Sequence, residues 1–210
     1  MKKGLLVLLV LLLAFGLVVF TGCQKKEEAK PAAEEEAKAE EEEEKMPGEG
    51  MLASMATDVG GLGDQSFNDG AHQGLQMAKE RLGVEVRVVE SKQQTDYIPN
   101  LTGLAEDGSD IVFAVGFLME KAVKEVASNM PDTYFAGIDI GAGEDDPDNF
   151  KGILYKEEQA GYLAGIVAGM MTKKHADKSD KLNDQNVVGV VLGMFVPPVE
   201  RYEVGFIQGV

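Results

Sequence analysis

The stretch Thr57–Gly70, TDVGGLGDQSFNDG, links a short apolar run to a helical pattern and decides the fold. A short apolar run leads into this stretch and ends at Asp58. Such a run is typical of a buried strand. The glycines of its GGLG segment permit the positive φ angles of a tight turn and let a ligand approach the backbone. Beyond the turn, apolar residues recur at helical spacing until Gly83 stops the pattern. The stretch therefore predicts a strand, a glycine turn and a helix.

The rest of the folded part alternates extended apolar runs with helical patterns. Later strands are predicted at 84–89, 111–115, 133–138, 153–155 and 187–192. Because strands alternate with helices along the chain, we expect an α/β fold whose parallel sheet is covered by helices on both faces.

Two features near the C-terminus bear on packing. Glycines recur every four residues from Gly161, within a helix predicted over 157–171. Since glycines at this spacing let a neighbouring backbone approach closely, we expect this helix to pack tightly onto the sheet. A turn at 197–198 is expected to precede a last helix over 201–210.

Polar and aromatic residues gather at one end of the predicted strands. Asp58 follows the first strand, Asp139 follows the strand at 133–138, and Phe67 and Asn68 open the first helix. Ligands of open α/β sheets bind where strand carboxyl ends face a helix amino terminus. Carboxylates accept hydrogen bonds from hydroxyl and ring N–H groups, an amide pairs with a base edge, and an aromatic face stacks on a flat ring. These residues therefore predict a site for a polar, planar, uncharged ligand.

Two of these residues also have a purely structural interpretation. Phe67 is placed to act as a hydrophobic staple on its helix, and Asp139 is placed to cap the loop that follows it. Both alternatives stay open at the level of the sequence.

Composition argues against several other functions. The net charge is −16, so the chain lacks the basic surface that a phosphate backbone requires, and we expect no nucleic-acid binding. The two histidines, His72 and His175, have no neighbour at metal-ligand spacing, so we expect no metal site. Cys23 is the one cysteine, which excludes an internal disulfide.

Nucleotide-dependent and hydrolytic chemistry are also disfavoured. The segment GLGDQS is similar to a dinucleotide-binding fingerprint, but Ser66 replaces its third glycine. Asp64 and Asp69 place negative charge where a pyrophosphate would lie. Ser66 also lacks the flanking glycines of a nucleophile elbow. We therefore expect no catalytic residue and no cofactor.

The first fifty residues resemble a bacterial lipoprotein leader followed by a tether. A positively charged start precedes an apolar run over 4–20, and Phe20-Thr21-Gly22-Cys23 resembles a lipobox. We expect 1–22 to be a signal peptide and the thiol of Cys23 to be lipidated, which anchors the protein to the extracytoplasmic face of the cell membrane. The Glu-, Lys- and Ala-rich segment 23–50 is expected to be a linker.

The chain from Met51 to Val210 resembles the basic membrane lipoprotein family, the PnrA-like substrate-binding lipoproteins of ABC transporters. The resemblance rests on several motifs and on a strand ending at Asp139; the motifs are DVGGLGDQSFNDGAHQGL, DYIPNL, VFAVGFLMEKAV, YKEEQAGYLAGIVAG and RYEVGFIQGV. It implies a periplasmic-binding-protein type I fold with two Rossmann-like lobes. The first lobe would occupy 51–152, and 153–210 would begin a second lobe that is incomplete in this chain.

The same resemblance implies binding of purine nucleosides for uptake, together with permease subunits and without enzymatic turnover. By this resemblance Asp58 contacts the ribose, Phe67 stacks on the base, and Asn68 and Asp139 contact the base edge. The alternatives are another small polar solute, or a role as a surface sensor or adhesin.

Overall fold

The computed structural model describes residues 45–174, 176–182 and 185–210. The predicted signal peptide, Cys23 and most of the predicted linker lie outside the described residues. The last linker residues pack against the folded part, where the N–H of Gly48 donates to the carbonyl oxygen of Leu82 at 2.7 Å.

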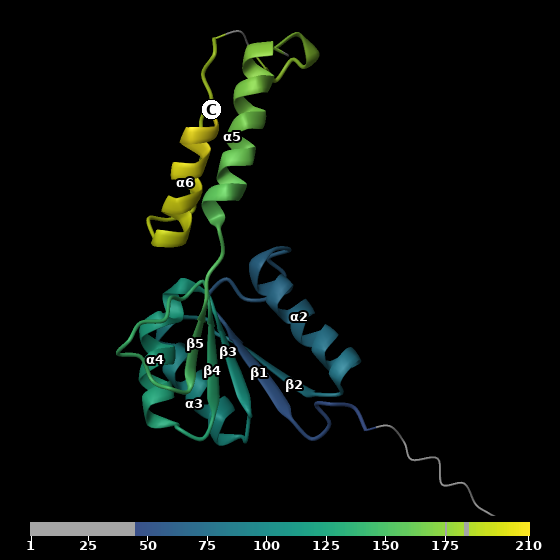
Figure 1. Cartoon of the computed structure of the whole chain (residues 1–210), viewed down its shortest axis with the longest axis vertical. Helices are drawn as coiled ribbons and strands as arrows, with labels where there is room; N and C mark the ends of the chain where they lie inside the picture. The colour runs from purple at the N-terminus through teal and green to yellow at the C-terminus, as the bar shows by residue number, and fades with distance from the viewer. Residues whose placement is uncertain (1–44, 175, 183–184) are drawn as a thin grey trace, which may run out of the picture. The chain divides into compact units, whose positions relative to one another are not determined.

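The described residues contain a five-stranded sheet in which every neighbouring pair of strands is parallel. The strands, in the spatial order β2-β1-β3-β4-β5, have the bounds β1 Leu52–Thr57, β2 Glu85–Glu90, β3 Ile111–Val115, β4 Tyr134–Ile138 and β5 Phe150–Ile153 (Figure 1). The predicted parallel α/β sheet is therefore confirmed.

Helices connect the strands and continue beyond the sheet. The α-helices are α2 Phe67–Leu82, α3 Tyr97–Glu106, α4 Glu120–Asn129, α5 Glu157–Lys174 and α6 Pro197–Gly209. Short 3₁₀ turns lie at Gln94–Asp96, Phe117–Met119 and Ala176–Lys178. Within these described ranges, no helix combines the length and apolar character needed to cross a bilayer.

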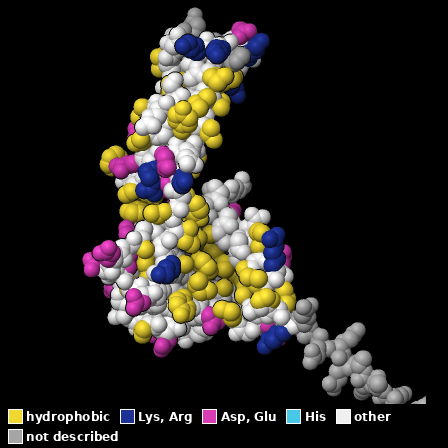
Figure 2. Space-filling model, in the orientation of Figure 1, with side chains coloured by type: hydrophobic (Ala, Val, Ile, Leu, Met, Phe, Trp, Pro, Cys, Tyr) yellow, Lys and Arg dark blue, Asp and Glu magenta, His cyan; other side chains and the backbone are white. Residues whose placement is uncertain are grey.

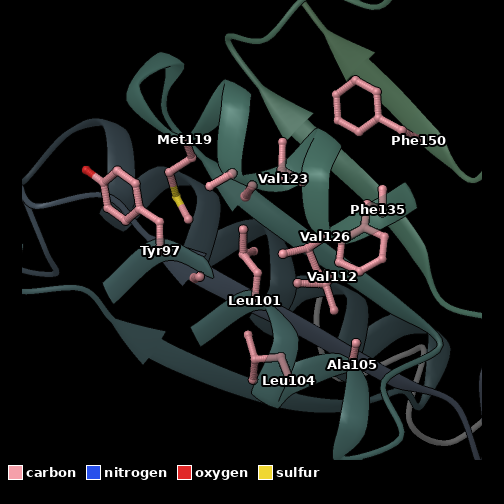
Figure 3. Close-up of a cluster of buried hydrophobic side chains, with 14 of the residues drawn as sticks. Tyr97, Leu101, Leu104, Ala105, Val112, Met119, Val123, Val126, Phe135 and Phe150 are labelled. Carbon is pink, nitrogen blue, oxygen red and sulfur yellow. The ribbon is translucent and has the colours of Figure 1, made fainter. Parts of the chain in front are cut away.

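The sheet is packed on both faces, because alternate residues of each strand point in opposite directions. On one face, Leu101 of α3 and Val123 of α4 pack with Val112 of β3 (Figure 3). On the other face, Leu75 of α2 packs with Met55 of β1. Both faces of the sheet thus bury apolar side chains, and the carboxyl ends of the strands are fixed relative to the start of α2.

The glycines of α5 pack on α6, whereas the sequence predicted packing on the sheet. A β-carbon at Gly161 or Gly165 would overlap backbone atoms of α6. In return, a β-carbon at Gly205 or Gly209 of α6 would overlap backbone atoms of α5. The prediction that α5 packs closely on a neighbour was correct, but the predicted neighbour, the sheet, was wrong. The neighbour is α6, which carries matching glycines at the same spacing.

Two predicted strands differ from the structure. The strand predicted at 153–155 lies at 150–153 as β5, because Phe150 is buried in the cluster on the α3 and α4 side. No strand forms at 187–192, where Val191 is 99% exposed. A strand requires a neighbour for its backbone hydrogen bonds, and 187–192 pairs with no strand of the described sheet.

The last helix begins inside the predicted turn. Pro197 and Pro198 form the first positions of α6. Proline is well suited to a first helical turn, because its missing N–H would have no partner within the helix there.

Candidate functional site

The turn after β1 brings Asp58 and Asn68 together. Asp58 Oδ1 accepts hydrogen bonds from the N–H of Gly60 at 2.9 Å and from Nδ2 of Asn68 at 3.0 Å. A β-carbon at Gly60 would lie 3.0 Å from Asp58 Oδ1 and 3.1 Å from Asn68 Nδ2. A larger residue at this position would therefore crowd the carboxylate and the amide where they meet.

Asp64 caps the start of α2. Its carboxylate accepts hydrogen bonds from the N–H groups of Ser66, Asn68 and Asp69 at 2.8–3.1 Å. Burial opposes ionisation, but these bonds outweigh it and lower the pKa of Asp64 to about 2. The amino terminus of α2 is thus already neutralised by a carboxylate, which disfavours a phosphate at this point.

Asp139 follows β4 with a positive φ of 62°. Its N–H donates to the carbonyl oxygen of Ile153 at 2.9 Å, so β5 fixes its backbone. Burial is the main cause that raises the pKa of the Asp139 carboxyl; Glu157 adds to the rise and Arg201 opposes it. Because Asp adopts this left-handed conformation more readily than most residues, the position suits an aspartate in particular.

A cavity of about 900 Å³ lies beside α2 and the sheet, and hydrophobic side chains gather around it (Figure 2). Phe67 and Asp139 line this cavity together with Tyr155 and Tyr202. Asp58 and Asn68 do not line it. The four predicted site residues therefore form two pairs at one edge of the sheet: Asp58 bonded to Asn68, and Phe67 with Asp139 on the cavity wall.

Three buried oxygens at this edge have no hydrogen-bond partner among the described residues: Thr57 Oγ1, Asn68 Oδ1 and Asp139 Oδ1. Asn68 is only 2% exposed. Leaving a buried polar atom without a partner costs free energy, about 1–3 kcal/mol for an ordinary group. Each of these oxygens can accept a hydrogen bond, so this edge of the sheet can receive donors from a ligand.

Two further residues support the turn that carries Asp58, and of these Tyr97 was not assigned a role from the sequence. The hydroxyl of Tyr97 accepts a hydrogen bond from the N–H of Val59 at 3.3 Å, and burial raises its pKa. At Gly116, where φ is 118°, a β-carbon would lie 2.9 Å from Asp58 Oδ2. The motif DYIPNL contains Tyr97, but only the fold places it beneath the turn.

An ion pair at the start of α5 was also missed. Arg201 Nε donates to Glu157 Oε2 at 2.7 Å, and its second guanidinium nitrogen donates to Oε1 at 3.2 Å. Glu157 is 5% exposed. The partners lie in separate helices, so no local pattern in the sequence could reveal the pair.

Among the described residues, no group of three His, Cys, Asp or Glu side chains is arranged to hold a metal ion. In the acidic loop after Asp139, the side chain of Asp146 accepts the N–H of Gly143 at 2.7 Å and pairs with Lys124 at 3.1 Å. That carboxylate therefore has a structural role in the loop.

Comparison with known proteins gives a consistent result. Residues 52–210 match the family described as ABC transporter substrate-binding protein PnrA-like. An uncharacterized lipoprotein of Pyrococcus furiosus is 37% identical over 164 residues, which cover 77% of this chain and 39% of that protein. The ABC transporter nucleoside-binding protein BmpA of Lactococcus lactis is 28% identical over 163 residues, covering 76% of this chain and 43% of that protein.

Solved structures agree with this relationship. A solute-binding protein of an ABC transporter system from Aeropyrum pernix K1 is 31% identical with a TM-score of 0.68, over 76% of this chain and 42% of that chain. A periplasmic solute-binding protein from Actinobacillus succinogenes, 11% identical with a TM-score of 0.57 over 76% of this chain and 53% of that chain, supports the fold alone.

The present chain thus spans about two-fifths of the length of the relatives that it matches. Its fold is that of the type I periplasmic binding proteins, as predicted. The match over 52–210 covers most of the sequence. The chain belongs to the family of PnrA-like substrate-binding proteins of ABC transporters.

Proposed function

We propose that the edge of the sheet formed by Asp58, Phe67, Asn68 and Asp139 binds a purine nucleoside for uptake by an ABC transporter. The observation that carries the proposal is the pair of buried, unpartnered oxygens on Asn68 and Asp139, at the edge of the sheet where Phe67 and Asp139 line the cavity. Oxygens of this kind receive N–H or O–H donors, and a half-buried aromatic face receives a flat ring. A nucleoside presents both features.

Each side chain has a distinct role in this proposal. Asp58 Oδ1 already accepts two hydrogen bonds, so Oδ2 is the atom that receives a ribose hydroxyl. Asn68 donates its amide hydrogens to Asp58 and Asp64, so its Oδ1 accepts from the ligand. Asp139 accepts a hydrogen bond from a donor on the base edge. An uncharged nucleoside is favoured over a nucleotide, because Asp64 already occupies the amino terminus of α2.

The nucleoside-binding name of the Lactococcus lactis relative supports this ligand class. Another small polar solute is the alternative ligand. The alternative role, as a surface sensor or adhesin, predicts binding of a protein that is insensitive to substitution of Asp58 and Asn68.

Binding without turnover is the expected result when the chain is incubated with inosine. The chain should gain thermal stability with millimolar inosine, and chromatography should detect no free hypoxanthine, because the site contains acceptors and an aromatic face but no activated nucleophile. Glucose serves as the control solute. Release of hypoxanthine would contradict the binding role, and equal stabilisation by glucose would contradict the ligand class.

The proposed location is the extracytoplasmic face of the cell membrane, with permease subunits as partners. The relatives from Pyrococcus are named lipoproteins, and Cys23 follows an apolar run. Cys23→Ser should abolish incorporation of an alkyne fatty acid in cells, because the chain has no second thiol to acylate. Label that persists on the variant would contradict the anchor.

A further inference from the structure

The turn between β1 and α2 is held in large part by its own carboxylates. Asp58 Oδ1 accepts the N–H of Gly60 at 2.9 Å. The carboxylate of Asp69 accepts the N–H groups of Gly63 and Gln65, at 2.8 and 2.9 Å. These acceptors lie within the turn or in the first turn of α2, so residues close in sequence fix the two ends of the turn.

The middle of the turn is held from another strand. The N–H of Leu62 donates to Glu90 Oε2 at 3.0 Å. Glu90 is the last residue of β2 and lies opposite Thr57, the last residue of β1, in the parallel register of the two strands. Leu62 and Glu90 are 28 positions apart, so the contact requires β2 to be paired with β1.

Gly61 shows how closely the Glu90 carboxylate lies on the turn. Its φ is 66°, and a β-carbon there would lie 2.8 Å from Glu90 Oε2. The same oxygen lies 3.5 Å from Lys92 Nζ, but the Lys92 side chain is 77% exposed. Exposed ion pairs are weak because water screens them. The hydrogen bond to Leu62 is therefore the contact through which Glu90 acts on the turn.

A turn with several glycines depends on such contacts. Gly60, Gly61 and Gly63 can adopt many backbone conformations, so ordering them costs conformational entropy. Asp58 precedes these glycines and Asn68 follows them, and the two side chains meet at 3.0 Å across the turn. The conformation of the turn therefore sets how Asp58 and Asn68 are placed.

We propose that Glu90 is a positioning residue for the candidate site: its carboxylate fixes the middle of the turn and thereby holds Asp58 and Asn68 ready to bind a ligand. The effect on ligand binding rests on the function proposed above, whereas the effect on the turn does not. A site that is ordered before the ligand arrives binds more tightly, because the binding free energy does not have to offset the cost of ordering it.

The effect on the turn is tested without ligand, by amide hydrogen exchange of the chain. Glu90→Ala removes the acceptor of Leu62 and is expected to speed exchange of the Leu62 amide by about three- to tenfold. Glu90→Gln keeps a side-chain oxygen at the same position along the side chain and is expected to retain most of the protection. The Glu90 side chain is 37% exposed, so neither substitution empties the core. Unchanged exchange of Leu62 in Glu90→Ala would overturn the proposal.

The effect on binding is tested by NMR titration of the same variants with inosine. Glu90→Ala is expected to raise the Kd by about three- to tenfold, and Glu90→Gln is expected to restore most of the wild-type affinity. A purely stabilising role would lower the urea midpoint of Glu90→Ala and leave the Kd unchanged, which would overturn the proposal. Equal loss of affinity in both variants would also overturn it, because Glu90→Gln still carries an acceptor.

Two controls separate this hydrogen bond from a general effect of charge. Lys92→Ala removes the ion-pair partner of Glu90 but leaves the contact with Leu62, and Glu85→Ala removes a carboxylate from the opposite end of β2. Both should leave the Kd for inosine within about twofold of the wild-type value, and a loss in either that equals the loss in Glu90→Ala would overturn the proposal. If the wild-type chain does not bind inosine, the proposed function fails, and the exchange of Leu62 alone decides whether Glu90 positions the turn.

Discussion

Gly165→Ala is expected to destabilise the packing of α5 against α6 by about 1–3 kcal/mol, the usual cost of overpacking a close contact. The added β-carbon would overlap the carbonyl oxygen of Phe206 and approach Gly209 Cα at 3.0 Å. Backbone atoms cannot turn away as a flexible side chain can, so the two helices must separate. Urea unfolding, with hydrogen exchange of the α5 amides, measures the loss.

Gly74→Ala is the matched control, because it makes the same change in the interior of α2. No atom lies within 4 Å of a β-carbon at Gly74. Helix propensity alone should then stabilise this variant by about 0.5–1 kcal/mol. Changes of opposite sign in the free energy of unfolding would support close packing of α5 and α6 through their glycines. A stabilising effect of Gly165→Ala would contradict that packing.

Phe67→Ala is expected to weaken inosine binding by about 5- to 150-fold, because stacking of a base on an aromatic ring contributes roughly 1–3 kcal/mol. Phe67 opens α2 and lines the cavity that Asp139 also lines. An NMR titration of the chain with inosine up to millimolar concentration measures the change even where binding is weak.

The apolar contacts of Phe67 must be separated from its stacking. Phe67 packs against the cluster of Met55 and Leu75, so its truncation also affects stability. Phe67→Leu keeps an apolar side chain in the cluster but removes the flat ring. Met77→Ala is the control, because it removes an exposed side chain from the same helix. If Phe67→Leu binds inosine as tightly as the wild-type chain, Phe67 is a hydrophobic staple only.

The fold could be predicted from the sequence wherever the signals are local. β1, the glycine turn and α2 follow from an apolar run, a GGLG segment and helical spacing within one continuous stretch. The strand predicted at 187–192 does not form. A strand depends on hydrogen bonds to a neighbouring strand, and the local sequence does not reveal whether such a neighbour is present. The glycines of α5 were recognised, but their partner helix lies elsewhere in the chain.

The candidate site could be predicted in part for the same reason. Asp58, Phe67, Asn68 and Asp139 stand at strand ends and at a helix start, which periodicity locates. Their supporting contacts are long-range. Glu157 and Arg201 are separated by 44 positions, and their bidentate pair exists only once α5 and α6 have packed together.

Amide chemical-shift mapping with inosine can locate a bound nucleoside on the chain. Millimolar inosine is expected to shift the amide signals of 58–68, 116–117 and 139, whereas equal concentrations of glucose should leave them unchanged. Asn68 and Asp139, whose side-chain oxygens have no partner, lie within these segments. Shifts confined to other parts of the chain, or the same shifts with glucose, would contradict nucleoside binding at this edge of the sheet.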